Sequence, residues 1–159
     1  MGEAIDESFS KLAADDMHAV AVYLRSVPAR SSNLPPQLAP PAPLSPKQGV
    51  MANLPGKHLF AGACVSCHGW SGESPLSPFA TLTGARAVND PSAANVAQAI
   101  IAGVHRTTPS GIISMPAFGD AFSDVEIAEL SNYVTARFGS TPSSLTAHDI
   151  AGFRKQTAQ

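Results

Sequence analysis

The chain has 159 residues, a formal net charge of −2 and only 14% charged residues. Its 10 basic and 12 acidic residues do not provide the strongly positive surface that nucleic-acid binding requires, so we expect no nucleic-acid partner. No apolar run reaches the length of about 20 residues that a membrane-spanning helix needs. The first residues also lack the basic segment followed by an apolar core that is typical of a signal peptide.

The first predicted element is an amphipathic helix within residues 1–27. Its spacing of apolar and acidic residues is repeated in a helix predicted much later, over 124–138. General amphipathicity is the alternative explanation of this match. The matching positions are Leu12, Asp16, Met17, Val20, Tyr23 and Leu24 in the first helix and Phe122, Glu126, Ile127, Leu130, Tyr133 and Val134 in the second.

Residues 28–50 are predicted to form a linker. The part from Pro28 to Pro46 is rich in proline, which cannot continue a helix or a central strand and favours an extended, polyproline-like path. We therefore expect a semi-rigid spacer between two units. Recognition by a proline-binding module is the alternative.

The next helix is predicted over about 54–64, with Gly56 and Phe60 on one face. It leads into Cys64-Val65-Ser66-Cys67-His68, which contains the only two cysteines of the chain. A C-x-x-C-H motif is the attachment signature of haem c. The two thiols lie one helical turn apart, so each can form a thioether with a haem vinyl group. The adjacent imidazole of His68 is then the proximal ligand of the iron.

Other uses of a Cys-x-x-Cys pair remain as alternatives. A structural zinc site needs four ligands, and the remaining histidines stand at no finger-like spacing. A thioredoxin-like redox pair is expected between a strand and a helix, whereas the residues before Cys64 have no strand-like alternation. A disulfide between Cys64 and Cys67 is the third alternative.

A helix is also predicted over 92–103, with Ser92 as its cap. Met115 follows it in the segment Ser-Met-Pro-Ala-Phe-Gly, where a proline and a glycine indicate non-helical chain able to cross the open face of a haem. A thioether ligand there would raise the reduction potential and leave no vacant position at the iron. His105 is the second candidate for this distal ligand and Met51 the third, while Met115 as ordinary core packing is the remaining alternative.

The strongest helix of the chain is predicted over 124–138. Ser123 and Glu126 have the spacing of a capping box, and Gly139 supplies the C-terminal stop. A last short helix is predicted from Ala147 to Lys155; it either folds back on the domain or forms an interface. Apolar residues of the longer helix recur at helical spacing, at Ile127, Leu130, Val134 and Phe138.

The segment CVSCHG at Cys64–Gly69 and the segment SMPAFGDAFSDVEIAELSNYV at Ser114–Val134 resemble a class I cytochrome c domain. More narrowly, they are similar to the last haem domain of the multi-haem cytochrome subunit of bacterial membrane-bound alcohol, aldehyde and gluconate dehydrogenases. The resemblance covers about residues 51 to 156 and implies an all-α fold around one covalent haem c per chain. It implies attachment at Cys64 and Cys67, axial ligation by His68 and Met115, and no catalytic residue.

Two structural details follow from the resemblance. The first and last helices of such domains cross closely, which implies that Gly56 and Phe60 meet Leu130 and Tyr133. Many relatives also carry two prolines before a Leu-x-Gly turn, where this chain has Ala80 and Thr81. The sequence therefore leaves undecided which backbone group accepts the Nδ1 proton of the proximal histidine, although some acceptor is expected.

We accordingly expect four parts: a haemless helical remnant of a preceding cytochrome domain at 1–27, the linker at 28–50, the cytochrome c domain at 51–140 and a tail at 141–159. Met1 would stand at the axial methionine position of the preceding domain. Haem c is attached outside the bacterial cytoplasm. The sequence is therefore expected to be part of a longer chain whose upstream region carries the export signal.

The resemblance implies single-electron transfer in a periplasmic dehydrogenase complex, at the outer face of the inner membrane. The expected partners are a dehydrogenase subunit, other cytochrome domains or a quinone, with membrane association only through the complex. Few charges suit a tethered carrier better than a freely diffusing, electrostatically steered one. A haem-based ligand sensor with an open sixth position is the alternative function, and a peroxidase-like enzyme would need a distal acid or base beside an open iron.

Overall fold

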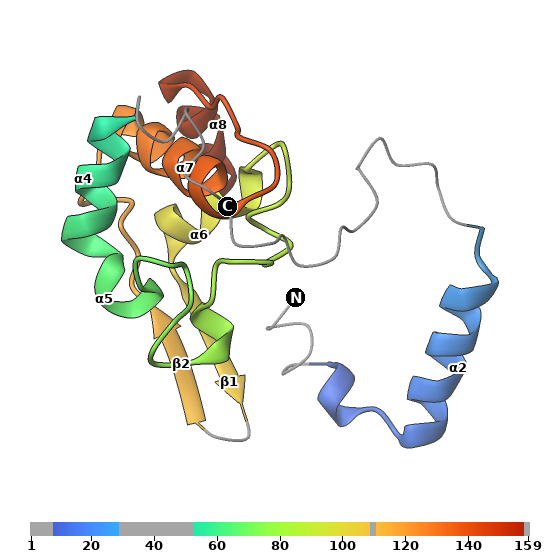
Figure 1. Cartoon of the computed structure of the whole chain (residues 1–159). Coiled ribbons are helices and arrows are strands. Elements are labelled where there is room, and N and C mark those ends of the chain that lie inside the picture. The colour runs from blue at the N-terminus through green and yellow to red at the C-terminus, as the bar shows by residue number, and fades with distance from the viewer. Residues whose placement is uncertain (1–7, 29–52, 109–110, 158–159) are drawn as a thin grey trace. The chain divides into compact units, whose positions relative to one another are not determined.

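The computed structural model describes residues 8–28, 53–108 and 111–157 (Figure 1). Within these residues the fold is helical except for one two-stranded sheet. None of the described helices combines the length and apolar character that crossing a bilayer requires. In chain order, the elements are η1 (Phe9–Lys11), α2 (Ala14–Ser26), α4 (Leu54–Ala63), α5 (Val65–His68), η2 (Pro78–Ala80), α6 (Ala94–Ala102), β1 (Val104–Thr108), β2 (Gly111–Met115), α7 (Asp124–Phe138) and α8 (Ala147–Thr157).

The chain divides into two compact units. Of the described residues, the first unit contains 8–28 and the two strands β1 and β2. The main unit contains 53–103 and 116–157, and therefore all helices from α4 onward. The C-x-x-C-H motif lies in the main unit.

The core of the main unit is built where α4 packs against α7 (Figure 1). A Cβ atom at Gly56 would lie 2.7 Å from Cβ of Tyr133 and would collide with the carbonyl oxygen of Glu129, so only glycine permits this close approach. The ring of Phe60 packs against that of Tyr133 with 5.5 Å between centroids. The predicted meeting of Gly56 and Phe60 with Tyr133 is confirmed, and Leu130 is buried on the same helix.

Helix α7 begins and ends where the sequence predicts, because both ends are fixed by specific contacts. The Ser123 hydroxyl accepts a hydrogen bond from the amide of Glu126, while the amide of Ser123 donates to the Glu126 carboxylate at 2.8 Å, which completes the capping box. Gly139 is the C-terminal cap, but its φ is −92°, outside the left-handed region. A Cβ atom there would lie 2.5 Å from the carbonyl oxygen of Val88, so close packing explains this glycine.

The start of α6 corrects the prediction of a helix over 92–103 capped by Ser92. The helix covers Ala94–Ala102 and its N-terminal cap is Ala93, which is fully buried and has a φ of 49°. Ser92 stands one residue before the cap, and its hydroxyl accepts a hydrogen bond from the amide of Ala94 at 3.3 Å. A left-handed residue other than glycine costs roughly 1–2 kcal/mol, and such a position is not visible in the sequence pattern.

Helix α8 folds back on the main unit and packs against both α6 and α7. Its Ile150 is fully buried, and the side-chain amide of Gln98 on α6 donates a hydrogen bond to the carbonyl of Phe153 at 3.2 Å. The helix begins with a second reciprocal cap, in which the Thr146 amide and the Asp149 carboxylate are hydrogen-bonded at 2.8 Å. The predicted short helix is therefore confirmed and belongs to the core.

Helix α2 forms within the predicted range, but every residue described in it is exposed. It has no side-chain hydrogen bond at its N-terminal cap, Ala13. Only the first residue of the predicted linker, Pro28, is described; the rest of that segment, like Met1 and Met51, lies outside the described residues.

Strands β1 and β2 form a hairpin that the sequence analysis did not predict. They pair antiparallel, with Val104 opposite Met115 and Thr108 opposite Gly111. The strands are rich in β-branched residues, which favour extended backbone. The segment around Met115 is non-helical as expected, and the hairpin adds a small sheet to the otherwise helical fold.

Candidate functional site

The C-x-x-C-H motif lies at the junction between two helices of the main unit. Cys64 ends α4 and begins the short helix α5, and the amide of His68 donates to the carbonyl of Cys64 at 3.0 Å. The turn ends at Gly69, whose φ is 70° and where a Cβ atom would collide with the carbonyl oxygen of Glu73. Glycine is thus needed directly after the histidine, both for the backbone conformation and for space.

The two cysteines differ in their surroundings. Cys64 is buried, Cys67 is exposed, and the two thiols are not joined to each other. Burial, together with the nearby Cys67, raises the pKa of the Cys64 thiol to about 11. A thiol-redox motif needs a lowered cysteine pKa, so this environment disfavours the thioredoxin-like alternative.

The proximal-ligand candidate His68 is oriented by the backbone. Its Nδ1 donates a hydrogen bond to the carbonyl oxygen of Ala80 at 2.6 Å, because a carbonyl oxygen can only accept. The hydrogen-bonded Nδ1 carries the proton, so Nε2 keeps its lone pair for a metal. Ala80 ends η2, a turn that begins at Pro78 and is capped by the Ser77 hydroxyl accepting from the amide of Phe79.

This hydrogen bond answers the question left open by the missing prolines. The acceptor is a main-chain carbonyl, and Ala80 presents it as well as a proline would. The sequence contained the one signal that could have located it, Pro78, because proline favours the start of a short helical turn.

The loop between Gly69 and Gly84 is tied back to the motif. The Ser74 hydroxyl donates to the carbonyl of Cys67 at 2.6 Å, and the carbonyl of Gly72 accepts from the amide of Leu82 at 2.7 Å. The Thr83 hydroxyl donates to the carbonyl of Ser71 at 3.0 Å. These contacts connect the two halves of the loop and hold the carbonyl of Ala80 against His68.

An aromatic cluster lies beside the motif. Phe60 is at its centre, with ring centroids 5.3 Å from Phe138, 5.5 Å from Tyr133 and 6.2 Å from Trp70. Trp70, two residues after His68, is half exposed. The cluster joins the chain after the motif to the buried crossing of α4 and α7, so the site is packed against the core of the main unit.

Two of the three candidate distal ligands, Met115 and His105, lie in the first unit, while Met51 is outside the described residues. Met115 is the last residue of β2 and is partly buried, whereas His105 on β1 is exposed, with its Nε2 3.4 Å from the Ser114 hydroxyl. The structure therefore brings Cys64, Cys67 and His68 together in one unit. The chain re-enters the main unit directly after Met115, and the amide of Phe118 donates to the carbonyl of Ile100 at 2.8 Å.

The residues at the motif fit a covalently attached haem. The chain offers two free thiols one turn apart and an imidazole whose Nε2 is available for iron. A helical domain with this site has the defining features of a c-type cytochrome.

Residues 52–134 match the family model described as "Cytochrome C oxidase, cbb3-type, subunit III", and the chain belongs to this cytochrome c family. Membership establishes haem c as the cofactor and electron transfer as its chemistry.

Similar proteins include cytochrome subunits of dehydrogenases. The fructose dehydrogenase cytochrome subunit of Gluconobacter japonicus is 28% identical over 97% of this chain and 36% of its own length. The cytochrome c subunit of alcohol dehydrogenase (quinone) from Gluconacetobacter polyoxogenes is 28% identical over 97% of this chain and 34% of its own length. The chain thus spans about a third of the length of these relatives. Cytochrome c6 of Bumilleriopsis filiformis is 33% identical over 52% of this chain and 87% of its own length.

Proposed function

We propose that this chain carries single electrons through one haem c, attached by Cys64 and Cys67 and ligated by His68 and Met115. The observation that carries the assignment of His68 is its 2.6 Å hydrogen bond to the carbonyl of Ala80. It fixes the ring orientation and the tautomer that a proximal ligand needs. When bound, haem supplies a reversible one-electron change at its iron.

The chain's own residues determine how that change is used. The two cysteines, at and after the junction of α4 and α5, would hold the haem covalently, and His68 would ligate its iron. The hydrogen bonds of the loop from Gly69 to Gly84, and above all that from His68 to the Ala80 carbonyl, restrain rotation of the imidazole. Little rearrangement between oxidation states is what rapid electron transfer requires.

Support for Met115 as the distal ligand comes from its position in the chain. It ends a strand and precedes a proline, and the chain is anchored to the carbonyls of Ile100 and Ile101 through the amides of Phe118 and Gly119, three and four residues further on. A ligand at the end of a short, anchored segment loses little conformational entropy on binding. His105, by contrast, lies on β1 and is exposed, whereas Met115 is partly buried.

We further propose that the domain works in a periplasmic, membrane-associated dehydrogenase complex, with a dehydrogenase subunit, other cytochrome domains or a quinone as its partners. The names of the relatives, which include an alcohol dehydrogenase (quinone) and a fructose dehydrogenase, support this setting. Helix α2 fits the same proposal as the end of a preceding cytochrome domain, since its residues match α7 in spacing.

Replacement of Met115 tests the ligand assignment. In the holoprotein, we expect Met115→Ala to lower the reduction potential by on the order of 0.1 V, since axial ligands set haem potentials over a range of roughly 0.8 V. It should also let carbon monoxide bind the reduced protein. Redox titration and absorption spectra measure both effects.

Two variants complete this experiment. Met17→Ala removes an exposed methionine of α2 and should leave the potential and the spectrum unchanged. His105→Ala tests the competing candidate for the distal ligand. If Met115→Ala leaves the spectrum unchanged while His105→Ala alters it, the distal ligand is His105. Ready carbon monoxide binding by the unaltered protein would instead support a ligand sensor.

A further inference from the structure

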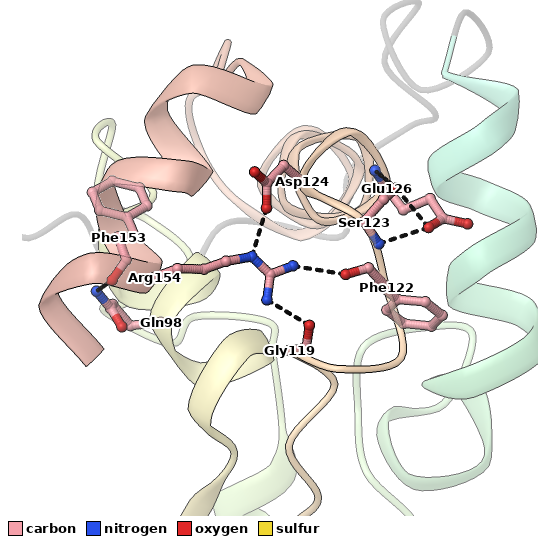
Figure 2. Close-up of polar contacts among 8 residues, drawn as sticks. All are labelled: Gln98, Gly119, Phe122, Ser123, Asp124, Glu126, Phe153 and Arg154. Carbon is pink, nitrogen blue, oxygen red and sulfur yellow. Dashed lines mark hydrogen bonds and ion pairs between the residues drawn. The ribbon is translucent and has the colours of Figure 1, made fainter. Parts of the chain in front are cut away.

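A single arginine of α8 contacts the segment that follows Met115 at three points (Figure 2). In Arg154, Nε donates to the carboxylate of Asp124 and Nη1 to the carbonyl of Gly119, each at 2.5 Å. Nη2 donates to the carbonyl of Phe122 at 2.7 Å. Arg154 and Asp124 are only 29% and 34% exposed, so water screens their ion pair incompletely.

The segment held by Arg154 is a tight turn between Met115 and α7. The amide of Gly119 donates to the carbonyl of Ile101 at 3.1 Å, and a Cβ atom at Gly119 would lie 2.8 Å from that carbonyl oxygen and 3.3 Å from Nη1 of Arg154. The rings of Phe118 and Phe122 stack with 5.4 Å between centroids. The turn is therefore fixed by α6 on one side and by Arg154 on the other.

Helix α8 is itself well anchored, so it can act as a fixed support. Ile150 is fully buried, the Gln98 side chain holds the carbonyl of Phe153, and Thr146 and Asp149 cap the first turn. Arg154 extends from this support with a planar guanidinium that can serve three acceptors at once (Figure 2). A lysine has one nitrogen and cannot match that fork.

We propose that Arg154 is a positioning residue for the distal ligand: by fixing the turn Gly119–Asp124, it limits how far Met115 can withdraw from the haem iron. This inference rests on the proposed ligation by Met115. Arg154 touches neither the haem iron nor Met115 in this role and acts only through the chain between them. Losing the fork leaves the turn held by α6 alone, so Met115 leaves the iron more often and an external ligand binds faster.

The test is the rate of cyanide binding to the oxidised holoprotein, since cyanide must wait for the methionine to leave. We expect Arg154→Leu to raise this rate by about tenfold or more, because hydrogen bonds from charged groups are each worth roughly a tenfold factor or more in an equilibrium. Arg154→Lys keeps the charge and part of the hydrogen bonding, so it should bind cyanide faster than the unaltered protein and more slowly than Arg154→Leu. The absorption band of the iron–sulfur bond should weaken in parallel.

Two control variants separate positioning from general effects. Lys155→Leu removes the neighbouring, exposed charge of α8 and should bind cyanide at the original rate. Gly56→Ala weakens the α4–α7 crossing without touching α8 or the fork, and urea unfolding shows how much stability each variant loses. If Gly56→Ala, at an equal loss of stability, accelerates cyanide binding as much as Arg154→Leu, the positioning role is wrong.

Met115→Ala serves as the reference that separates this inference from the proposed function. If Met115→Ala binds cyanide rapidly while both Arg154 variants keep the original rate, the ligand assignment stands and the role of Arg154 is refuted. If Met115→Ala binds cyanide no faster than the unaltered protein, the ligation itself is wrong and the inference falls with it.

Discussion

Helices α2 and α7 carry the same spacing of apolar residues, yet one is exposed and the other is buried. Tyr23 on α2 is 67% exposed, whereas Tyr133 at the matching position of α7 is 2% exposed. Val20 and Leu130 differ in the same way, at 38% and 1%. The two helices differ much less in sequence pattern than in surroundings.

The surroundings explain the difference. The apolar face of α7 meets Gly56 and Phe60 of α4, and α8 packs on another side of it. Helix α7 also has a capping box at its start, whereas α2 begins at Ala13 without a side-chain cap. An amphipathic pattern is enough to make a helix, but burial requires a second element whose shape matches it.

The largest expected difference between the two helices is at the matched tyrosines. Tyr133→Ala should lower the free energy of unfolding of the holoprotein by about 3–5 kcal/mol, because it leaves a cavity among Phe60, Phe138 and α4. Tyr23→Ala removes an exposed ring and should change it by less than about 0.5 kcal/mol. Urea denaturation followed by circular dichroism measures both. Similar losses would show that α2 is buried in solution.

The helix crossing itself is tested by two glycines of α4. Gly56→Ala should destabilise the holoprotein by about 1–3 kcal/mol, because its Cβ has no room against Tyr133 and the carbonyl of Glu129. Gly62→Ala is the matched control: in the described structure no neighbouring atom lies within 4 Å of an added Cβ. It should stabilise the helix by up to about 1 kcal/mol. Thermal unfolding measures whether each variant is less or more stable than the unaltered protein. A change of the same sign in both variants would contradict the close crossing.

The capping box of α7 gives a smaller effect that depends on pH. Ser123→Ala should cost about 1 kcal/mol at neutral pH, while Ser144→Ala in an exposed loop should cost almost nothing. Hydrogen bonds from the Ser123 side chain and amide lower the pKa of Glu126 in the folded protein. A lowered folded pKa stabilises above the unfolded value of about 4.3, and this contribution is lost as the pH falls through the folded pKa. The difference in free energy of unfolding between the Ser123→Ala variant and the unaltered protein should therefore shrink on acidification. Urea titrations at several pH values measure it. A difference that stays constant with pH would contradict the expectation.

Most of the helical framework of the main unit could be predicted from the sequence. Periodic apolar residues and capping signals located α4, α7 and α8 to within about two residues, and the family resemblance implied the close crossing at Gly56. The predicted start of α6 was wrong because Ala93, which is fully buried, adopts a left-handed conformation that the sequence pattern does not reveal. The hairpin was missed because its strands are short and because the proline and glycine after Met115 indicated only non-helical chain.

The candidate site divides in the same way. The motif at Cys64–His68 could be found directly, because side-chain chemistry defines it. The acceptor of the His68 proton is a main-chain carbonyl, and the fork of Arg154 joins residues 30 or more positions apart. Neither follows from local sequence pattern, because both depend on how distant segments fold together.

The comparison of the two helices also predicts the haem content, which is the most direct test of the account. One C-x-x-C-H motif precedes α7 and none accompanies α2, so each chain should carry one covalent haem c. After expression with a haem c maturation system, intact-mass measurement under denaturing conditions should show the mass of the chain plus one haem. The variant with both Cys64→Ala and Cys67→Ala should show the mass of the chain alone. A chain that carries no covalent haem, or two, would contradict the account.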